Sequence, residues 1–188
     1  MIDESERAIA DEKKKLRSLA ASIAPTTSAE SAAITATVRE VLRRHEWTTV
    51  LTFLAMPGEV DLGGLRSDPV LTLAVTRTPR TGPLTIHALE EPLERHRFGY
   101  LQPRPDAKPI ASDGIEAVLV PGLLFARDGG RLGHGKGYYD ELLSSLPGRP
   151  YLIGATVDRR VVDTLPMTDR DVWMDALATE SGLVEVAP

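Results

Sequence analysis

Short apolar runs of strand length alternate with helical segments along this chain, and this alternation limits its fold more than any other feature. Helical spacing of apolar residues predicts three helices, over Asp3–Ile23, Ala29–His45 and Tyr138–Leu146. Apolar runs bounded by turn residues predict strands over Val50–Met56, Val70–Val75, Leu84–Leu89, Ala117–Val120, Tyr151–Val157 and Met174–Thr179. The pattern favours a layered α/β fold with a largely parallel sheet.

Size and composition narrow the class further. A chain of 188 residues is large enough for one buried core and small for two, so we expect a single domain over residues 1–188. The net charge of −5 and the absence of a Lys/Arg block disfavour a nucleic-acid partner. Because the chain has no cysteine, disulfides, cysteine–zinc sites and a cysteine nucleophile are excluded.

The start of the chain and its apolar runs bear on location. The first 17 residues are dense in charge and do not resemble a secretory signal. The longest charge-free runs, such as Trp47–Gly58, are too short to span a bilayer. We therefore expect a cytoplasmic monomer with small-molecule substrates, no nucleic-acid partner and no membrane association.

In parallel α/β sheets, ligands bind at the carboxyl ends of the strands. The loops to inspect are therefore those that follow Met56, Val120 and Val157. Gln102–Pro109 contains three prolines, so we expect an extended connector there instead of a helix or strand.

A glycine-rich segment, Gly130–Gly137, directly precedes the third predicted helix. Glycines let the backbone approach a ligand closely, and amides at a helix start attract anions. The segment matches the G-x-x-x-x-G-K part of a P-loop, but Gly137 stands where that motif has Ser or Thr. A bound metal would need another ligand, and Asp140 is the nearest carboxylate. From spacing alone, a plain mobile turn with an acidic helix start explains the pattern equally well.

At two further places, the side chains either bind a ligand or are ordinary surface residues. Lys13 and Arg17 share a helix face beside Lys14, where a phosphate or carboxylate could dock or where the side chains are simply solvated. Glu59 follows a strand end and a Pro-Gly turn; it suits a heterocycle's N–H groups, or it is an exposed loop residue. The histidines lack metal-ligand spacing, and His134 lies in the glycine segment.

The longest motifs resemble those of one family. Val120-Pro-Gly-Leu-Leu-Phe125 followed by Gly130-Arg-Leu-Gly-His-Gly-Lys-Gly-Tyr-Tyr-Asp140 resembles the signature of the 5-formyltetrahydrofolate cyclo-ligases. Similar matches are Lys13-Lys-Lys-Leu-Arg17, Leu54-Ala-Met-Pro-Gly-Glu59, Phe98-Gly99 through Pro103, and Leu165-Pro166 with Asp171 and Asp175. The resemblance implies a three-layer α/β sandwich with a mostly parallel central sheet.

The resemblance also implies roles for individual residues. It implies ATP binding by Lys13, Lys14, Arg17, Arg131, Gly133, His134, Gly135, Lys136, Gly137, Tyr138 and Tyr139, with Lys136 and Arg131 catalytic. It implies folate contacts by Arg17, Leu54, Glu59, Gly135 and Tyr138, and a Mg²⁺ ion held by Asp140 and Asp171. Some positions depart from the pattern: Arg170 replaces a histidine, and Val157 and Arg160 replace a phenylalanine and a glutamine.

The implied reaction is the ATP-dependent closure of 5-formyltetrahydrofolate to 5,10-methenyltetrahydrofolate, with release of ADP and phosphate. Two other classes stay open from sequence. One is a non-catalytic nucleotide- or folate-binding module on the same fold. The other is a sugar-phosphate isomerase on a similar scaffold, which would need a general-base carboxylate near the glycine segment and no ATP.

Overall fold

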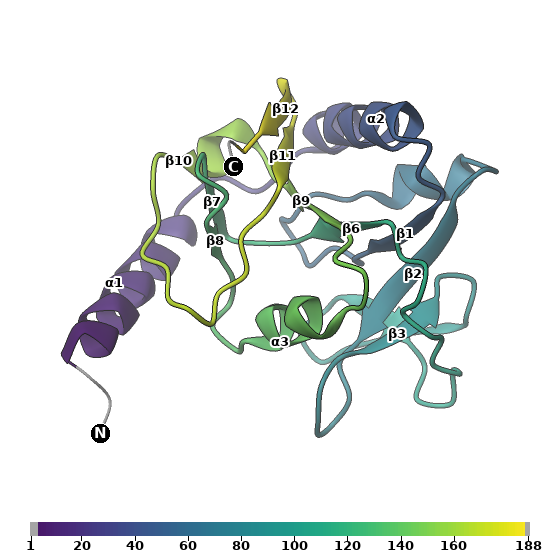
Figure 1. Ribbon diagram of the computed structural model, residues 1–188, viewed down its shortest axis with the longest axis horizontal. Helices are drawn as coiled ribbons and strands as arrows, with labels where there is room; N and C mark the ends of the chain where they lie inside the picture. The colour runs from purple at the N-terminus through teal and green to yellow at the C-terminus, as the bar shows by residue number, and fades with distance from the viewer. Residues whose placement is uncertain (1–3, 187–188) are drawn as a thin grey trace.

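A seven-stranded sheet forms the centre of the protein, described by a computed structural model that covers residues 4–186 (Figure 1). The strand order is β12-β11-β9-β6-β1-β2-β3. The five inner strands run parallel, and the two edge strands pair antiparallel to their neighbours. Their bounds are β1 Thr49–Thr52, β2 Thr72–Arg77, β3 Thr85–Ala88, β6 Ala117–Val120, β9 Tyr151–Ala155, β11 Ala176–Thr179 and β12 Gly182–Glu185.

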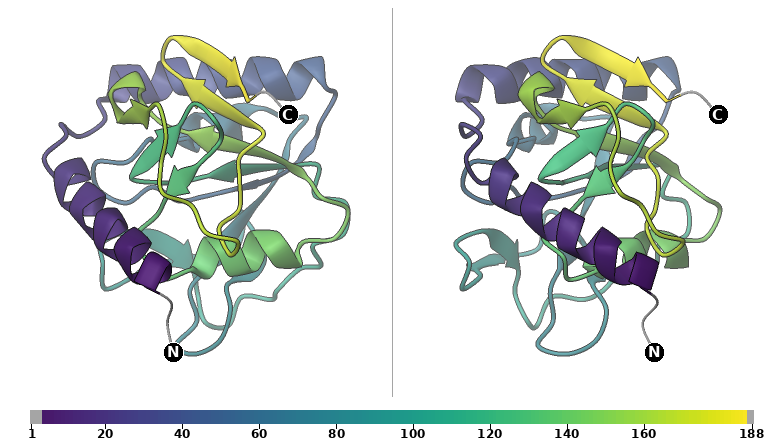
Figure 2. Two further views of the ribbon diagram at one scale, coloured as in Figure 1. Left: turned by 60° about the vertical axis from the view of Figure 1, so that its left-hand side comes forward. Right: turned by 90° about the vertical axis from the view of Figure 1, so that its left-hand side faces the viewer.

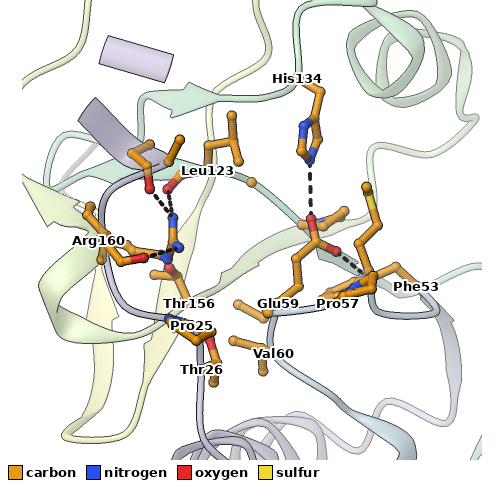
Figure 3. A pocket seen from close by; sticks show the side chains of 18 residues that line it. Pro25, Thr26, Phe53, Pro57, Glu59, Val60, Leu123, His134, Thr156 and Arg160 are labelled. Atoms are coloured by element: carbon orange, nitrogen blue, oxygen red, sulfur yellow. Dashed lines mark hydrogen bonds and ion pairs between the residues drawn. The ribbon is translucent and has the colours of Figure 1, made fainter. Parts of the chain in front are cut away.

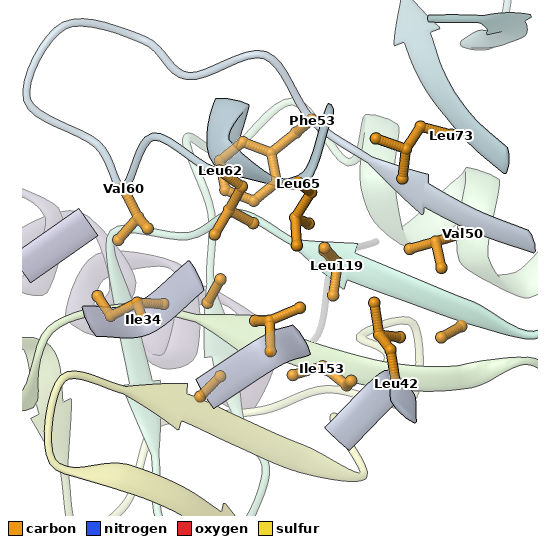
Figure 4. Close-up of a cluster of buried hydrophobic side chains, with 14 of the residues drawn as sticks. Ile34, Leu42, Val50, Phe53, Val60, Leu62, Leu65, Leu73, Leu119 and Ile153 are labelled. Atoms are coloured by element: carbon orange, nitrogen blue, oxygen red, sulfur yellow. The ribbon is translucent and has the colours of Figure 1, made fainter. Parts of the chain in front are cut away.

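Helices cover both faces of this sheet. Helix α2 (Ser28–Arg44) lies on one face and the shorter α3 (Tyr138–Ser145) on the other (Figure 1). Alternation along the strands divides the apolar side chains between the two faces. In β1, for example, Val50 packs with the α2 residues and Leu51 with the α3 residues (Figure 4). The predicted three-layer α/β sandwich with a mostly parallel sheet is confirmed.

A smaller sheet and α1 stand beside the sandwich. The strands are β10 (Val161–Val162), β7 (Leu124–Ala126) and β8 (Arg131–Leu132), and α1 spans Glu4–Ala20. Figure 2 shows α1 running past this sheet and away from the large one. Ala20 and Leu16 pack against Leu124 and Leu132 of the small sheet. Because β8 is part of the glycine segment, α1 and that segment are neighbours.

Most predicted elements are present, with ends that differ by a few residues. Strand β6 has the predicted bounds, and α2 begins one residue early because Thr27 forms a capping box with Glu30. Helix α1 ends at Ala20, short of the predicted Ile23, and the predicted start at Asp3 lies outside the described residues. No helix within residues 4–186 is both long and apolar enough to cross a bilayer.

The prediction for Gln102–Pro109 was wrong at its beginning. Strand β5 (Leu101–Pro103) includes its first two residues and pairs antiparallel with β4 (Leu93–Arg95). A proline is compatible with strand pairing at an edge, where its missing N–H faces no partner. This two-stranded hairpin is a separate sheet that contacts β2, where Arg77 donates to the Pro103 carbonyl at 3.0 Å, and Gly99 near its tip lies against Pro57.

Candidate active site

A cavity of about 290 Å³ lies at the carboxyl ends of β1, β6 and β9. These three strands are neighbours in the sheet, so the loops that follow them meet, as the sequence predicted. The connection between α1 and α2 forms another wall (Figure 3). The lining residues are Ala20, Ala21, Ile23, Pro25, Thr26, Phe53, Met56, Pro57, Gly58, Glu59, Val60, Pro121, Gly122, Leu123, His134, Ala155, Thr156 and Arg160.

Glu59 is the acidic group of the cavity wall. Its Oε2 accepts a hydrogen bond from the Met56 amide at 2.9 Å, which fixes the carboxylate within its own turn. Its Oε1 lies 3.3 Å from Nε2 of His134, which belongs to the glycine segment (Figure 3). The side chain is only 17% exposed. Glu59 is therefore half-buried at the point where the cavity meets the glycine segment.

Arg160 provides a positive charge in the same cavity. Its Nη1 donates to the Leu123 carbonyl at 3.0 Å and to the Ala20 carbonyl at 3.4 Å (Figure 3). Burial lowers the pKa of Arg160, and neighbouring Arg159 lowers it further. Arg159 in turn donates to the Pro25 carbonyl at 2.9 Å. The two arginines thus fasten the α1–α2 connection that forms one wall of the cavity.

The glycine segment makes a tight turn into α3. Gly135 and Gly137 have φ values of +86° and +72°, in the left-handed region that favours glycine. His134 and Lys136 are exposed at this turn, and α3 begins one residue after Gly137. A flexible cationic side chain beside a helix start is suited to binding a phosphate.

Helix α1 brings two of its basic residues to this turn. Arg17 donates from Nε to the Gly133 carbonyl at 2.9 Å, and its guanidinium lies over Gly135. Lys13, one turn earlier, places its Nζ 2.5 Å from Oδ2 of Asp171. Lys14 is exposed on the helix surface. The structure therefore brings Arg17 to the glycine segment and Lys13 to Asp171, whereas the Lys14 side chain is exposed.

Arg131 is buried beneath the same segment. Its side chain is 4% exposed, and its Nη2 donates to Oδ1 of Asp140 at 2.8 Å. Nη1 lies 3.4 Å from the Pro121 carbonyl, and the guanidinium stands 5.8 Å from the centre of the Tyr139 ring. Burial raises the pKa of Tyr139 to about 12, so this side chain stays a neutral phenol. Arg131 therefore holds Asp140 in place, while its buried Nε has no hydrogen-bond partner among the residues that the structure describes.

Comparison with known proteins bears directly on this arrangement. A model of the 5-formyltetrahydrofolate cyclo-ligase family matches residues 3–180. The chain belongs to this family.

Individual relatives agree with this assignment. The 5-formyltetrahydrofolate cyclo-ligase of Saccharomyces cerevisiae is 27% identical over 184 residues, covering 84% of this chain and 87% of that protein. The mitochondrial cyclo-ligase of Arabidopsis thaliana is 35% identical over 88 residues, which cover 42% of this chain and 32% of that protein. Several curated relatives are matched over only 32–52% of their length.

The fold is shared with a solved structure. The 5,10-methenyltetrahydrofolate synthetase of Aquifex aeolicus superposes with a TM-score of 0.74 at 22% identity, covering 95% of this chain and 93% of that one. At this identity the likeness concerns the fold alone.

The residues that a cyclo-ligase family member is expected to use for folate are only partly gathered at the cavity. Glu59 lines it, whereas Leu54 is half-buried against the core on the α2 side. Tyr138 is 38% exposed at the start of α3. The sequence did not single out Phe53, Leu123 or Thr156 as lining residues. Phe53 and Thr156 directly follow β1 and β9, and Leu123 lies three residues after the end of β6, so these positions were the available signal.

The metal expected from the cyclo-ligase family is compatible with the carboxylates present. Asp140 Oδ1 accepts from the Val172 amide at 3.3 Å, so Asp140 adjoins the loop that carries Asp171. Within residues 4–186, no three His, Asp or Glu side chains form a metal-binding group. Mg²⁺ commonly uses one or two carboxylates together with phosphate oxygens, so two neighbouring aspartates suffice. Asp140 Oδ2 and Asp171 Oδ1 accept no hydrogen bond from any residue that the structure describes.

Asp171 itself is held in a charged form. Burial raises its pKa, but hydrogen bonds from Lys13 and Thr168 outweigh that effect and leave the pKa below its ordinary value. Thr168 donates to Oδ2 from both its amide, at 2.6 Å, and its hydroxyl, at 2.8 Å. A carboxylate that stays ionised and fixed in this way is a suitable metal ligand.

Proposed function

We propose that the protein catalyses ATP-dependent ring closure of 5-formyltetrahydrofolate to 5,10-methenyltetrahydrofolate, with release of ADP and phosphate. Membership of the cyclo-ligase family over residues 3–180 supports this assignment. The observation that carries it within the structure is the contact between Glu59 and His134 at 3.3 Å. This contact joins a cavity suited to a heterocycle to a glycine segment suited to phosphate.

The chemistry requires activation of the substrate. An N5-formyl oxygen cannot leave as oxide when N10 attacks the formyl carbon. Transfer of the γ-phosphoryl group of ATP to this oxygen breaks the bond to ADP and forms an activated, imidate-like phosphate that is still attached to N5. N10 then attacks the same carbon and gives up its proton, and the C–O bond breaks as phosphate departs. Because the cavity and the glycine segment adjoin, ATP and the folate bound there would be held close together, as both steps require.

The roles of individual residues follow from their positions. Lys136 and the amides of the glycine segment would stabilise the transferring phosphoryl group, as cationic and N–H donors do in other phosphoryl transfers. Arg17 lies over Gly135, one residue after the cavity-lining His134, and would contact both substrates. Glu59 would accept hydrogen bonds from the N–H groups of the pterin ring. Asp140 and Asp171 would hold Mg²⁺, which neutralises phosphate charge when it is bound.

The direct test uses the full chain with 5-formyltetrahydrofolate and MgATP, with the methenyl product followed by absorbance. We expect product only when ATP is present, with one ADP and one phosphate released for each methenyl product. Product formed at full rate without nucleotide would exclude this mechanism. Binding of both ligands without turnover would instead identify a non-catalytic binding module.

Replacement of Glu59 tests the folate side of the site. In Glu59→Gln, the side-chain carbonyl can keep the Met56 hydrogen bond. The amide NH2 group then faces the substrate, where the wild-type side chain has an acceptor. We expect the apparent Michaelis constant for the folate to rise about tenfold, as for the loss of one charged hydrogen bond, on the order of 1.4 kcal/mol. The constant for ATP should change much less.

Steady-state kinetics with each substrate varied in turn will measure this difference. The exposed Glu90 lies in a turn after β3, so Glu90→Gln is a suitable control for loss of one surface charge. An effect of Glu59→Gln on ATP alone would contradict the assignment of Glu59 to the folate side.

A further inference from the structure

Both aspartates expected to hold Mg²⁺ are paired with cations from this chain. Lys13 Nζ lies 2.5 Å from Asp171 Oδ2, with the two side chains 12% and 15% exposed. Arg131 Nη2 lies 2.8 Å from Asp140 Oδ1. Ion pairs this far from bulk solvent are screened less by salt than surface pairs. The nucleotide-free site is therefore neutralised by the protein itself.

We propose that Lys13 has a second role besides ATP binding: it occupies Asp171 until a nucleotide arrives, so that the protein takes up Mg²⁺ only together with nucleotide. This inference rests on the proposed function, because it takes ATP as the ligand of the glycine segment. It assigns to one lysine the coupling between metal and nucleotide.

The two ion pairs differ in how firmly they are held. Arg131 is fixed by Asp140, by the Pro121 carbonyl and by packing over the Tyr139 ring. A Cβ at Gly133 would lie 2.9 Å from its Nη1, which shows how closely the backbone encloses it. The structure gives Lys13 one side-chain partner, Asp171, and its ammonium ends a flexible four-carbon stem. Lys13–Asp171 is therefore the pair that can open.

The position of Lys13 also gives it an alternative partner. Lys13 lies one helical turn before Arg17, whose Nε bonds to the Gly133 carbonyl at 2.9 Å. Its partner Asp171 directly precedes Val172, whose amide donates to Asp140 in the first turn of α3 at 3.3 Å. The ammonium therefore lies near the helix start that follows the glycine segment. With phosphate, the ammonium can exchange the carboxylate for a phosphate oxygen without becoming unpaired.

Charge balance then couples the two ligands. A divalent cation on Oδ1 of Asp171 would lie close to the ammonium on Oδ2, and repulsion between the two positive charges opposes its binding while the ammonium stays. If the ammonium leaves without a new partner, it becomes an unpaired, half-buried charge, which is strongly unfavourable. When nucleotide supplies the new partner, this penalty disappears. Nucleotide must therefore raise the affinity for the metal, and by linkage the metal raises the affinity for nucleotide by the same factor.

Binding of Mn²⁺ to the full chain, followed by electron paramagnetic resonance of the free ion, tests the proposal without turnover or folate. We expect wild-type protein to bind Mn²⁺ weakly alone and much more tightly with a non-hydrolysable ATP analogue. Lys13→Met removes the competing charge and keeps the apolar stem. It should bind Mn²⁺ about tenfold more tightly without nucleotide, with a correspondingly smaller gain from the analogue.

Matched variants separate this effect from general changes in charge. Lys15→Met removes an exposed lysine from the same helix and should behave as wild type. Adding Asp171→Asn to Lys13→Met should abolish the gain in Mn²⁺ affinity, and circular dichroism will show whether each variant is folded. If folded Lys13→Met binds Mn²⁺ no more tightly than wild type, the proposal is wrong. Because no folate is present, that result is independent of whether the protein forms methenyltetrahydrofolate.

Discussion

We expect Lys136→Ala to remain folded and to lose a factor of about 10² to 10³ in turnover, the range found when one stabilising donor is removed from a transition state. Lys136 is exposed in the turn before α3, and no residue within 4–186 accepts a hydrogen bond from its ammonium. Its removal therefore leaves no buried group unpaired, and the free energy of unfolding should change by less than about 0.5 kcal/mol. The loss should lie in the charge that meets the transferring phosphoryl group.

Turnover with saturating ATP and folate, together with thermal melting followed by circular dichroism, will measure both parts of this prediction. The exposed Lys108 lies in the loop after β5, and Lys108→Ala should retain wild-type turnover. Near-normal kinetics in folded Lys136→Ala would show that the glycine segment has a structural role only.

A second large effect is expected from Gly135→Ala. The φ of +86° imposes a left-handed conformation that costs about 1–2 kcal/mol for a residue with a Cβ. The new Cβ would also lie 3.0 Å from Cζ of Arg17, so the guanidinium must give way by a few tenths of an ångström. Because Arg17 is proposed to contact both substrates, we expect weaker binding of both ATP and folate, about tenfold beyond the effect of strain.

Gly137→Ala isolates that strain. Gly137 has a similar φ of +72°, but a Cβ there would meet no atom within 4 Å. It should lose stability like Gly135→Ala and keep most of its affinity for both substrates. Titration calorimetry with each substrate, together with chemical denaturation, distinguishes the two variants. Equal losses of affinity in both would contradict the proposed role of Arg17 in binding both substrates.

The sandwich could be predicted because its signals are local. The strand Ala117–Val120 is a continuous apolar run, as expected for a strand buried on both faces, and its predicted bounds were those observed. The strands of the small sheet are two or three residues long, too short to show any periodicity. Their existence depends on pairing with distant segments, so the sequence alone did not predict them.

In the candidate site, too, features with local sequence signals could be predicted and features that depend on distant residues could not. The loops at the carboxyl ends of the strands were predicted because parallel strands place those ends together. The contact between Glu59 and His134 joins residues 75 positions apart, and local spacing carries no information about such a pair. The burial of Arg131 was also not predictable, because arginine is usually exposed unless a partner such as Asp140 is buried with it.

The position of α1 determines when, during synthesis of the chain, Lys13 and Arg17 can reach their partners. Its contacts with the rest of the chain are made to residues translated much later: Arg17 bonds to a residue 116 positions on, and Lys13 to one 158 positions on. An isolated helix of this length is only marginally stable in water. Since α1 is translated before these partners, it has no docking surface until they have followed. The residues proposed to bind phosphate are therefore brought together only after synthesis has passed Asp171.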